Sequence, residues 1–295
     1  MADTSLLSPF VVRLGGGLVL DKDTFSIPPG AALQLQNFEP DINGGYRRIN
    51  GFENYDTNQV GGGTGTILGL HIYKDQVIAA KGTAVYKGTG SGWTSIDTGR
   101  TSAGRYNFVN FNFDGTDKMI MVDGQNNASV YDNSTVTDIS VSGAPADPAF
   151  VEVFRSHIFY AGMSASPQEL IFSEPFDEDG FTAGDGAGSI KVDEPIVGIK
   201  VFRENLFVFC EDSIFKITGS SLSDFAVVPV TRAIGCVDGF SIQEISGDLV
   251  YLAPDGLRTI AGTERIGDVE LGTISKQVQP RLDGITTDRI SSVVI

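Results

Sequence analysis

The run Leu206-Phe-Val-Phe-Cys210 is uninterrupted apolar sequence, which is typical of a strand buried on both faces. Another apolar run precedes it, a third follows it, and short polar turns separate the three. Four similar runs occur elsewhere: Val77-Ile-Ala-Ala-Lys-Gly82, Met119-Ile-Met-Val-Asp-Gly124, Ile158-Phe-Tyr-Ala-Gly162 and Leu249-Val-Tyr-Leu-Ala253. The five runs begin at residues 77, 119, 158, 206 and 249, so they are 42, 39, 48 and 43 residues apart. A period of about 40 to 50 residues with three or four strands per unit is typical of an array of blades.

This repeat predicts an all-β fold, a β-propeller-like array of antiparallel three- to four-stranded blades with about five recognisable units. A unit of this length cannot cover both faces of its own sheet, so neighbouring blades must bury it. We expect the propeller core at residues 61–272, an N-terminal extension at 1–60 and a C-terminal segment at 273–295, whose continuation into further structure is open. The expected strands are 67–73, 76–81, 84–88, 106–113, 118–122, 150–154, 157–161, 168–173, 196–202, 205–210, 213–217, 240–245, 248–252 and 257–261.

The composition fits this fold and limits the partners. The chain has 295 residues with 36 Gly and 19 Phe, and brief helical turns are expected only at 29–36 and 274–282. The formal net charge of −16 argues against non-specific nucleic-acid binding, because Lys and Arg supply that affinity. The charge indicates either a solubility role or acidic side chains that line a passage for DNA. The two cysteines, Cys210 and Cys236, are expected to be buried free thiols.

Residue patterns of catalysis or cofactor binding are scarce, and we expect no catalytic residue, metal or cofactor. The two histidines, His71 and His157, lie in or beside expected strands, without a Cys or carboxylate cluster at ligand spacing. The glycine runs at 61–65 and 88–92 fit no phosphate-binding pattern, so they are expected to be loops. The acidic loop at 177–186 is interpreted as a solvated loop, with a calcium site as the alternative.

A propeller that binds or hydrolyses glycans is the alternative function, because sialidases use several arginines on such a fold. A third possibility is a monomeric propeller that binds peptides through an apolar face. The arginines here are scattered along the sequence, at 100, 105, 155, 203, 232 and 258. A hydrolase would require them, or a pair of carboxylates, to converge on a central pocket.

The N-terminal extension carries a recognisable motif. Ile27-Pro-Pro-Gly-Ala-Ala-Leu-Gln-Leu-Gln-Asn-Phe38 is followed by Gly44-Gly-Tyr-Arg-Arg-Ile-Asn-Gly-Phe52. This segment resembles the opening of tail nozzle proteins of short-tailed bacteriophages, also called tail tubular protein B. In that family a similar motif precedes weak propeller repeats. The resemblance is motif-like only over residues 27–55, and Gly44-Gly45 also fits a plain hairpin turn.

The resemblance implies a non-enzymatic structural protein of the virion tail, made in the host cytoplasm and not inserted in a membrane. Family members form a ring, typically of six subunits, attached to the portal and adaptor proteins. The ring encloses the channel through which double-stranded DNA leaves, and it provides surfaces for fibres, spikes or a plug. Family members are usually much longer, so this chain is either a compact member or part of a longer polypeptide.

Two groups of charged residues are candidates for roles in such a ring. Arg47 and Arg48, the only adjacent basic pair, are the interface candidates, and we expect them to meet carboxylates of the same or an adjacent subunit. Carboxylates that face the lumen would repel phosphates and keep the genome from adhering. The lumen candidates are Asp114, Asp117, Asp177, Asp179 and Asp185.

Overall fold

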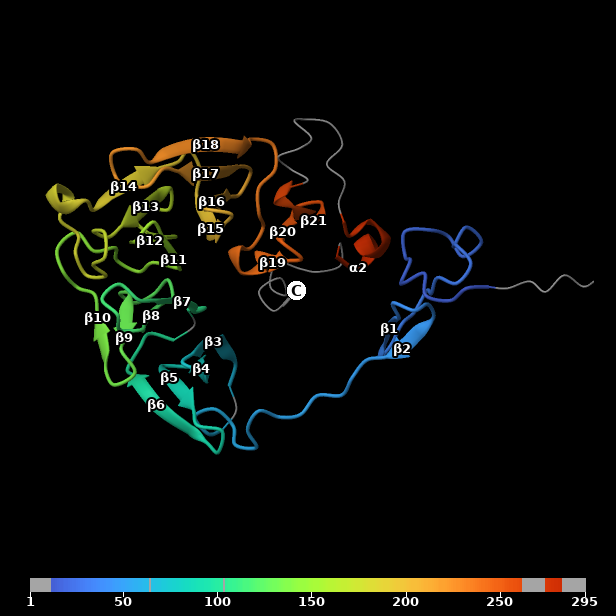
Figure 1. Ribbon diagram of the computed structural model, residues 1–295. Helices are drawn as coiled ribbons and strands as arrows, with labels where there is room; N and C mark the ends of the chain where they lie inside the picture. The colour runs from blue at the N-terminus through green and yellow to red at the C-terminus, as the bar shows by residue number, and fades with distance from the viewer. Residues whose placement is uncertain (1–11, 64, 103, 262–273, 283–295) are drawn as a thin grey trace, which may run out of the picture.

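The protein is a β-propeller of five antiparallel sheets that follow one another around a common centre (Figure 1). A computed structural model describes residues 12–63, 65–102, 104–261 and 274–282. Four sheets have four strands and the fifth has three, and within each sheet every strand pairs with its neighbour in sequence. The predicted fold class is therefore confirmed. None of the described helices is long and apolar enough to cross a membrane.

The five blades contain the following elements. Blade 1 is β3 (Ile67–Tyr73), β4 (Gln76–Lys81), β5 (Ala84–Gly88) and β6 (Trp93–Thr98). Blade 2 is β7 (Asn107–Phe111), β8 (Lys118–Val122), β9 (Ser129–Tyr131) and β10 (Val136–Asp138). Blade 3 is β11 (Phe150–Phe154), β12 (His157–Ala161), β13 (Glu169–Phe172) and β14 (Gly188–Lys191), with the 3-10 turn η1 (Ala183–Asp185). Blade 4 is β15 (Ile196–Phe202), β16 (Asn205–Cys210), β17 (Ile214–Thr218) and β18 (Ala226–Thr231). Blade 5 is β19 (Gln243–Ile245), β20 (Asp248–Ala253) and β21 (Gly256–Thr259).

Each expected strand has a counterpart among these elements, but the outermost strands β6, β10, β14 and β18 and the short third strand of blade 2, β9, were not predicted. The outermost strands are partly exposed, and β6, β10 and β14 lack a continuous apolar run, whereas β18 is apolar but interrupted by Pro229. The strand expected at 240–245 is also shorter, because Gly239–Ser241 forms the 3-10 turn η2. Asp238 caps this turn by accepting a hydrogen bond from the backbone N–H of Phe240.

The two helical turns expected from the sequence have different outcomes. Residues 274–282 contain η3 (Lys276–Val278) and the short helix α2 (Gln279–Leu282), as expected. Residues 29–36 contain no helix. Gly30 has φ +88°, which is incompatible with a helix, and the backbone of Ala32 instead pairs with Gly17.

The core lies between the blades. Four clusters of buried apolar residues fill the junctions between blades 1 and 2, 2 and 3, 3 and 4, and 4 and 5. The junction of blades 4 and 5 includes Phe207, Phe209 and Tyr251, so the prediction that the β16 phenylalanines belong to the core is confirmed. Among the described residues, no such cluster joins blade 5 to blade 1. Figure 1 shows blades 1 and 5 at the two ends of the arc.

The N-terminal extension forms a separate small lobe, residues 12–49, connected to blade 1 by an extended arm, residues 50–63 (Figure 1). The lobe contains the hairpin of β1 (Phe38–Pro40) and β2 (Tyr46–Arg48). The Tyr46 hydroxyl donates to the Gly30 carbonyl at 2.8 Å, which holds the hairpin on the preceding loop. The arm ends on blade 1, where the Lys81 ammonium donates to the Val60 carbonyl at 2.7 Å. The lobe also contacts η3, since the Leu20 N–H donates to the Gln277 carbonyl.

Candidate functional site: the turn faces and hub of the propeller

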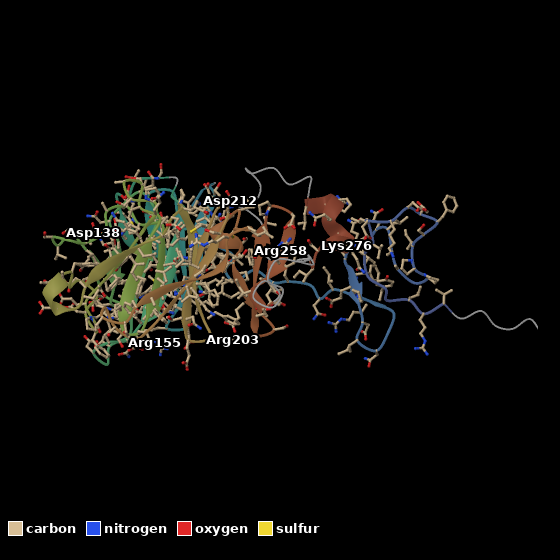
Figure 2. All side chains as sticks on the ribbon, turned by 90° about the horizontal axis from the view of Figure 1, so that it is seen from above. Asp138, Arg155, Arg203, Asp212, Arg258 and Lys276 are labelled. Atoms are coloured by element: carbon tan, nitrogen blue, oxygen red, sulfur yellow. The ribbon has the colours of Figure 1, made fainter. Side chains whose placement is uncertain are left out.

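The connections between strands lie on two opposite faces of the propeller. Turns from first to second and from third to fourth strands share one face, here called the hairpin face, because strand direction alternates within each blade. Arg155 and Arg203 belong to this face, and Figure 2 shows them opposite Asp138 and Asp212. The second face, here called the crossover face, carries the second-to-third turns and the links between blades.

The hairpin face is rich in carboxylates. Its basic residues in the turns and loops of blades 1 to 4 are Lys74, Arg155 and Arg203. Its acidic residues in the same turns and loops are Asp75, Asp114, Asp117, Asp132, Glu174, Asp177, Glu178, Asp179, Asp185, Glu204 and Asp224. All five lumen candidates are in this set. The fold therefore brings to one face two segments that the sequence gives no reason to place together, 112–117 and 173–187.

Lys118 joins these two segments. Its ammonium lies 2.5 Å from Glu178 Oε1 and 3.3 Å from Asp114 Oδ2. The hydrogen bond to Glu178 is the main cause that raises the pKa of Lys118 above its ordinary value. Asp117 faces a different neighbour, accepting from the Asn112 amide at 2.8 Å. The loop 173–187 is thus anchored on blade 2.

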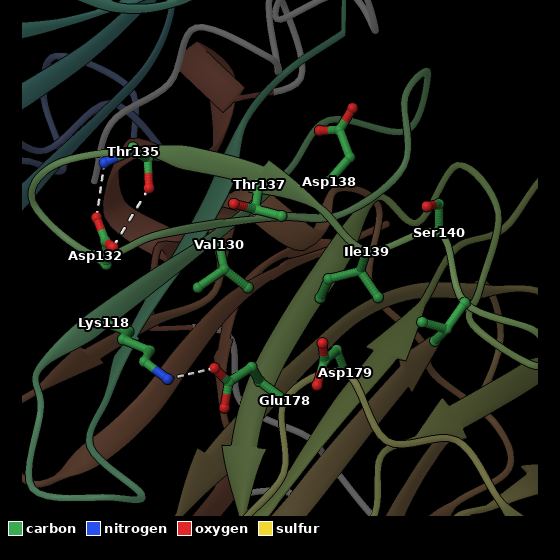
Figure 3. A pocket seen from close by; sticks show the side chains of 11 residues that line it. Lys118, Val130, Asp132, Thr135, Thr137, Asp138, Ile139, Ser140, Glu178 and Asp179 are labelled. Carbon is green, nitrogen blue, oxygen red and sulfur yellow. Dashed lines mark hydrogen bonds and ion pairs between the residues drawn. The ribbon is translucent and has the colours of Figure 1, made fainter.

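A pocket of about 270 Å³ opens beside this anchor, between blades 2 and 3 (Figure 3). Most of its carboxylates are already engaged within the protein. Asp132 caps its own turn at Thr135, Glu178 pairs with Lys118, and Asp138 accepts from the Ser129 hydroxyl. Asp179 differs, because a hydrogen bond with Asp177 raises its pKa, and burial raises it further.

The propeller centre, or hub, carries polar residues from the innermost strands of four blades. His71 Nε2 lies 2.8 Å from Asn110 Oδ1, and its ring stacks on Phe108. Burial lowers the pKa of His71, and the positive charge of Lys200 across the hub lowers it further. Lys200 Nζ itself lies 2.5 Å from Glu152 Oε1. Sequence reasoning missed this cluster.

A positional signal could have found part of the hub. His71, Glu152 and Lys200 each stand two residues before the end of the first strand of their blade. A further link crosses the hub from blade 2 to blade 5. Arg105 Nη1 lies 3.0 Å from Asp238 Oδ2, and its guanidinium stacks 3.7 Å from the Phe240 ring centroid. The charged side chains at the hub therefore pair with one another and link the blades at the propeller centre.

The six scattered arginines do not converge. Each has its own acceptor: Asp97 for Arg100, Asp238 for Arg105, Glu204 for Arg155, the Gly247 carbonyl for Arg203, Asp193 for Arg232 and Asp255 for Arg258. Within the described ranges, no three His, Cys, Asp or Glu side chains are grouped to hold a metal ion. Both cysteines are buried and free, as expected.

The interface candidates lie in the lobe, on strand β2. Arg47 Nε lies 2.7 Å from Glu39 Oε1 of the paired strand β1, and both side chains are well exposed. Arg48 is exposed at the end of the same strand. The Gly44-Gly45 pair forms the hairpin turn, with φ +91° at both residues. Arg47 thus meets a carboxylate of its own chain, and a contact with an adjacent subunit stays a prediction.

Comparison with known proteins gives a fold and no family. No family model matches this chain, and no curated protein matches it. Solved structures similar to it include the extracellular domain of a one-component system from B. thetaiotaomicron, with TM-score 0.48, 10% identity, and coverage of 70% of this chain and 33% of that chain. The Pan2 WD40 domain of Neurospora crassa matches with TM-score 0.46, 13% identity, and coverage of 65% and 60%.

A chain of a nidogen/laminin complex also matches, with TM-score 0.46, 11% identity, and coverage of 72% of this chain and 82% of that one. This chain spans about a third of the length of the first of these structures and about three fifths of the second. At such identities the similarity concerns the fold alone. The chain is a β-propeller protein.

Proposed function

We propose that this chain is a structural subunit of the tail nozzle of a short-tailed bacteriophage. It assembles into a ring, typically of six copies, that is attached to the portal and adaptor proteins and surrounds the path of the ejected DNA. Its place is the virion tail, and its role is mechanical and electrostatic without catalysis. Fibre, spike or plug proteins are the further partners.

The observation that carries this proposal is the position of the motif. Residues 27–49 of the nozzle-like segment lie in the lobe, and the arm joins them to a propeller, which is the order of parts that the resemblance implies. A lobe on an extended arm is suited to contacts outside its own propeller. The acidic hairpin face adds support, because clustered carboxylates repel DNA phosphates at distances within the screening length of the solution.

Electron microscopy and mass measurement of the purified protein test the proposal. The expected result is a ring with a central hole and, for six copies, a mass six times the 31.4 kDa of the chain. Antibody labelling of particles of the phage that encodes the protein is expected to mark the tail next to the portal. Labelling confined to another part of the particle, or a complete absence from particles, would contradict the proposal.

A glycan-binding propeller is the second candidate, and the pocket between blades 2 and 3 favours it. Thr135, Thr137 and Ser140 line this pocket beside Asp179, and hydroxyl and carboxyl groups of this kind hydrogen-bond sugars. Glycan-array binding that is lost in Asp179→Asn, with the protein monomeric, would favour this candidate over the nozzle.

A further inference from the structure

Blade 1 has an apolar face that none of the other blades, as far as the structure describes them, covers. In β3, His71 and Tyr73 face blade 2, so the alternating residues Leu70 and Ile72 point to the opposite side, here called the free face. Their exposed fractions are 63% and 65%. The arm covers only the outer part of this sheet, where Gly61 packs against Tyr86.

The same positions are buried in other blades. Leu70 and Ile72 stand three and one residues before the end of β3, and the corresponding pair in blade 3 is Val151 and Val153. Both valines belong to the core between blades 2 and 3, and Val151 is 1% exposed. In blade 4 the corresponding residues, Ile199 and Val201, pack in the core between blades 3 and 4. The free face is therefore the continuation, in blade 1, of an interface that the repeat encodes in blades 3 and 4.

The lobe contacts its own chain at η3, but it also has apolar side chains that no described residue covers. Phe25 is 100% exposed, Ile42 98% and Phe38 50%, so several large apolar side chains of the lobe project into solvent. Its sheet has only the two strands β1 and β2, and an isolated two-stranded sheet is marginally stable in water. The arm keeps the lobe away from the blade 1 free face of its own chain (Figure 1).

The charged residues near the two surfaces favour a second copy of this chain as the partner. The lobe carries Arg47 and Arg48, while the whole chain has a net charge of −16. Asp75, in the exposed turn that follows β3, offers one carboxylate at the edge of the free face, next to Lys74. The basic pair, of which Arg47 also bonds Glu39, can reach that carboxylate when the apolar lobe covers the apolar face.

We propose that the lobe of one subunit covers the free face of blade 1 of a second copy. The two surfaces are different, so the contact is head-to-tail, and a head-to-tail contact generates a ring when the rotation between subunits closes. This inference rests on the proposed ring, and it names the surfaces that join neighbouring subunits. The interface continues the blade-to-blade packing of the propeller across the subunit boundary.

Two double variants of the full chain test the contact. The free-face variant is Leu70→Ser with Ile72→Ser, and the lobe variant is Phe25→Ser with Ile42→Ser. All four side chains are mainly exposed in the subunit, so the fold is retained, as circular dichroism will verify. In sedimentation velocity, each variant alone is expected to raise the dissociation constant of assembly at least tenfold. An equimolar mixture of the two is expected to form a one-to-one dimer, because one intact lobe can still meet one intact free face.

A third double variant, Val141→Ser with Leu222→Ser, is the matched control, because these residues are 44% and 43% exposed elsewhere on the propeller. It is expected to assemble like the unmodified protein. A monomeric unmodified protein, a mixture that stays monomeric, or equal disruption by the control would overturn the inference. If both test variants still form a nozzle ring in particles, this contact is refuted and the proposed function stands. If the mixture forms dimers but the protein is absent from particles, the contact stands and the proposed function is refuted.

Discussion

The Lys200 ammonium of blade 4 lies 2.5 Å from Oε1 of Glu152 in blade 3, so an ion pair joins two neighbouring inner strands at the hub. Glu152 is 9% exposed, and burial raises the pKa of its carboxyl although Lys200 opposes the shift. A carboxyl whose pKa is raised by folding stabilises the fold below its unfolded pKa of about 4.3, and this contribution is lost as pH rises through the folded pKa.

Lys200→Met is expected to lower the free energy of unfolding by about 1–3 kcal/mol at pH 7, because the buried carboxylate loses its charged partner. The loss is expected to shrink at pH 4, where Glu152 becomes neutral. Urea unfolding at both pH values measures this. The double variant Glu152→Gln with Lys200→Met serves as the control and is expected to recover most of the stability. An equal loss at pH 7 and pH 4 would show that Glu152 does not carry the effect.

Phe209→Ala is expected to lower the free energy of unfolding by about 3–5 kcal/mol, because its side chain fills the junction of blades 4 and 5. Phe209 is fully buried, and its ring centroid lies 5.3 Å from that of Tyr251. Chemical denaturation provides the measurement. Val228→Ala in the same blade, at a residue that is 37% exposed, is the control and is expected to cost less than about 1 kcal/mol. A cost below about 1 kcal/mol for Phe209→Ala would exclude it from the core.

Arg47→Glu with Arg48→Glu is expected to weaken assembly more than folding. The exposed pair of Arg47 with Glu39 contributes only about 0–1 kcal/mol to stability, so the melting temperature should change little. Light scattering and thermal melting measure the two effects. Arg232→Glu is the matched control, since Arg232 forms a similarly exposed pair with Asp193 on the propeller. Unchanged assembly of the double variant would rule out an interface role for the basic pair.

Asp114→Lys with Asp185→Lys is expected to slow DNA ejection at low salt and to restore the rate at high salt. New lysines would bind phosphates, and that attraction falls steeply as salt increases. Both aspartates are exposed on the hairpin face. Glu211→Lys with Asp212→Lys makes the same charge change on the crossover face and is expected to leave the rate unchanged. If both variants behave alike at every salt concentration, the acidic residues confer solubility only.

Cys210 and Cys236 are expected to resist thiol reagents in the native protein. Burial raises the pKa of both thiols to about 12, so almost no reactive thiolate is present at neutral pH. Titration with a chromogenic disulfide reagent is expected to detect no thiol in buffer and both in urea. Rapid stoichiometric reaction in native buffer would mean that blade 4 opens easily.

Apart from the three-residue β9, the inner three strands of each blade could be predicted because their determinants are local. The turns 74–75, 155–156 and 203–204 join apolar runs that pair only with the next strand in sequence. The fourth strands escaped prediction for the opposite reason. A strand such as β14, Gly188–Lys191, pairs along one edge and is partly exposed, so its sequence needs no apolar run.

The β-propeller, the blade period and the middle strands follow from local sequence patterns, because side-chain burial within a blade selects consecutive apolar residues. Which distant residues meet depends on how the blades pack. His71, Glu152 and Lys200 belong to three blades, and Asp114 and Glu178 share Lys118 across two. These proximities depend on the rotation between successive blades, which the packing of whole sheets sets. The period of a sequence fixes the length of each blade, but it carries no information about that rotation.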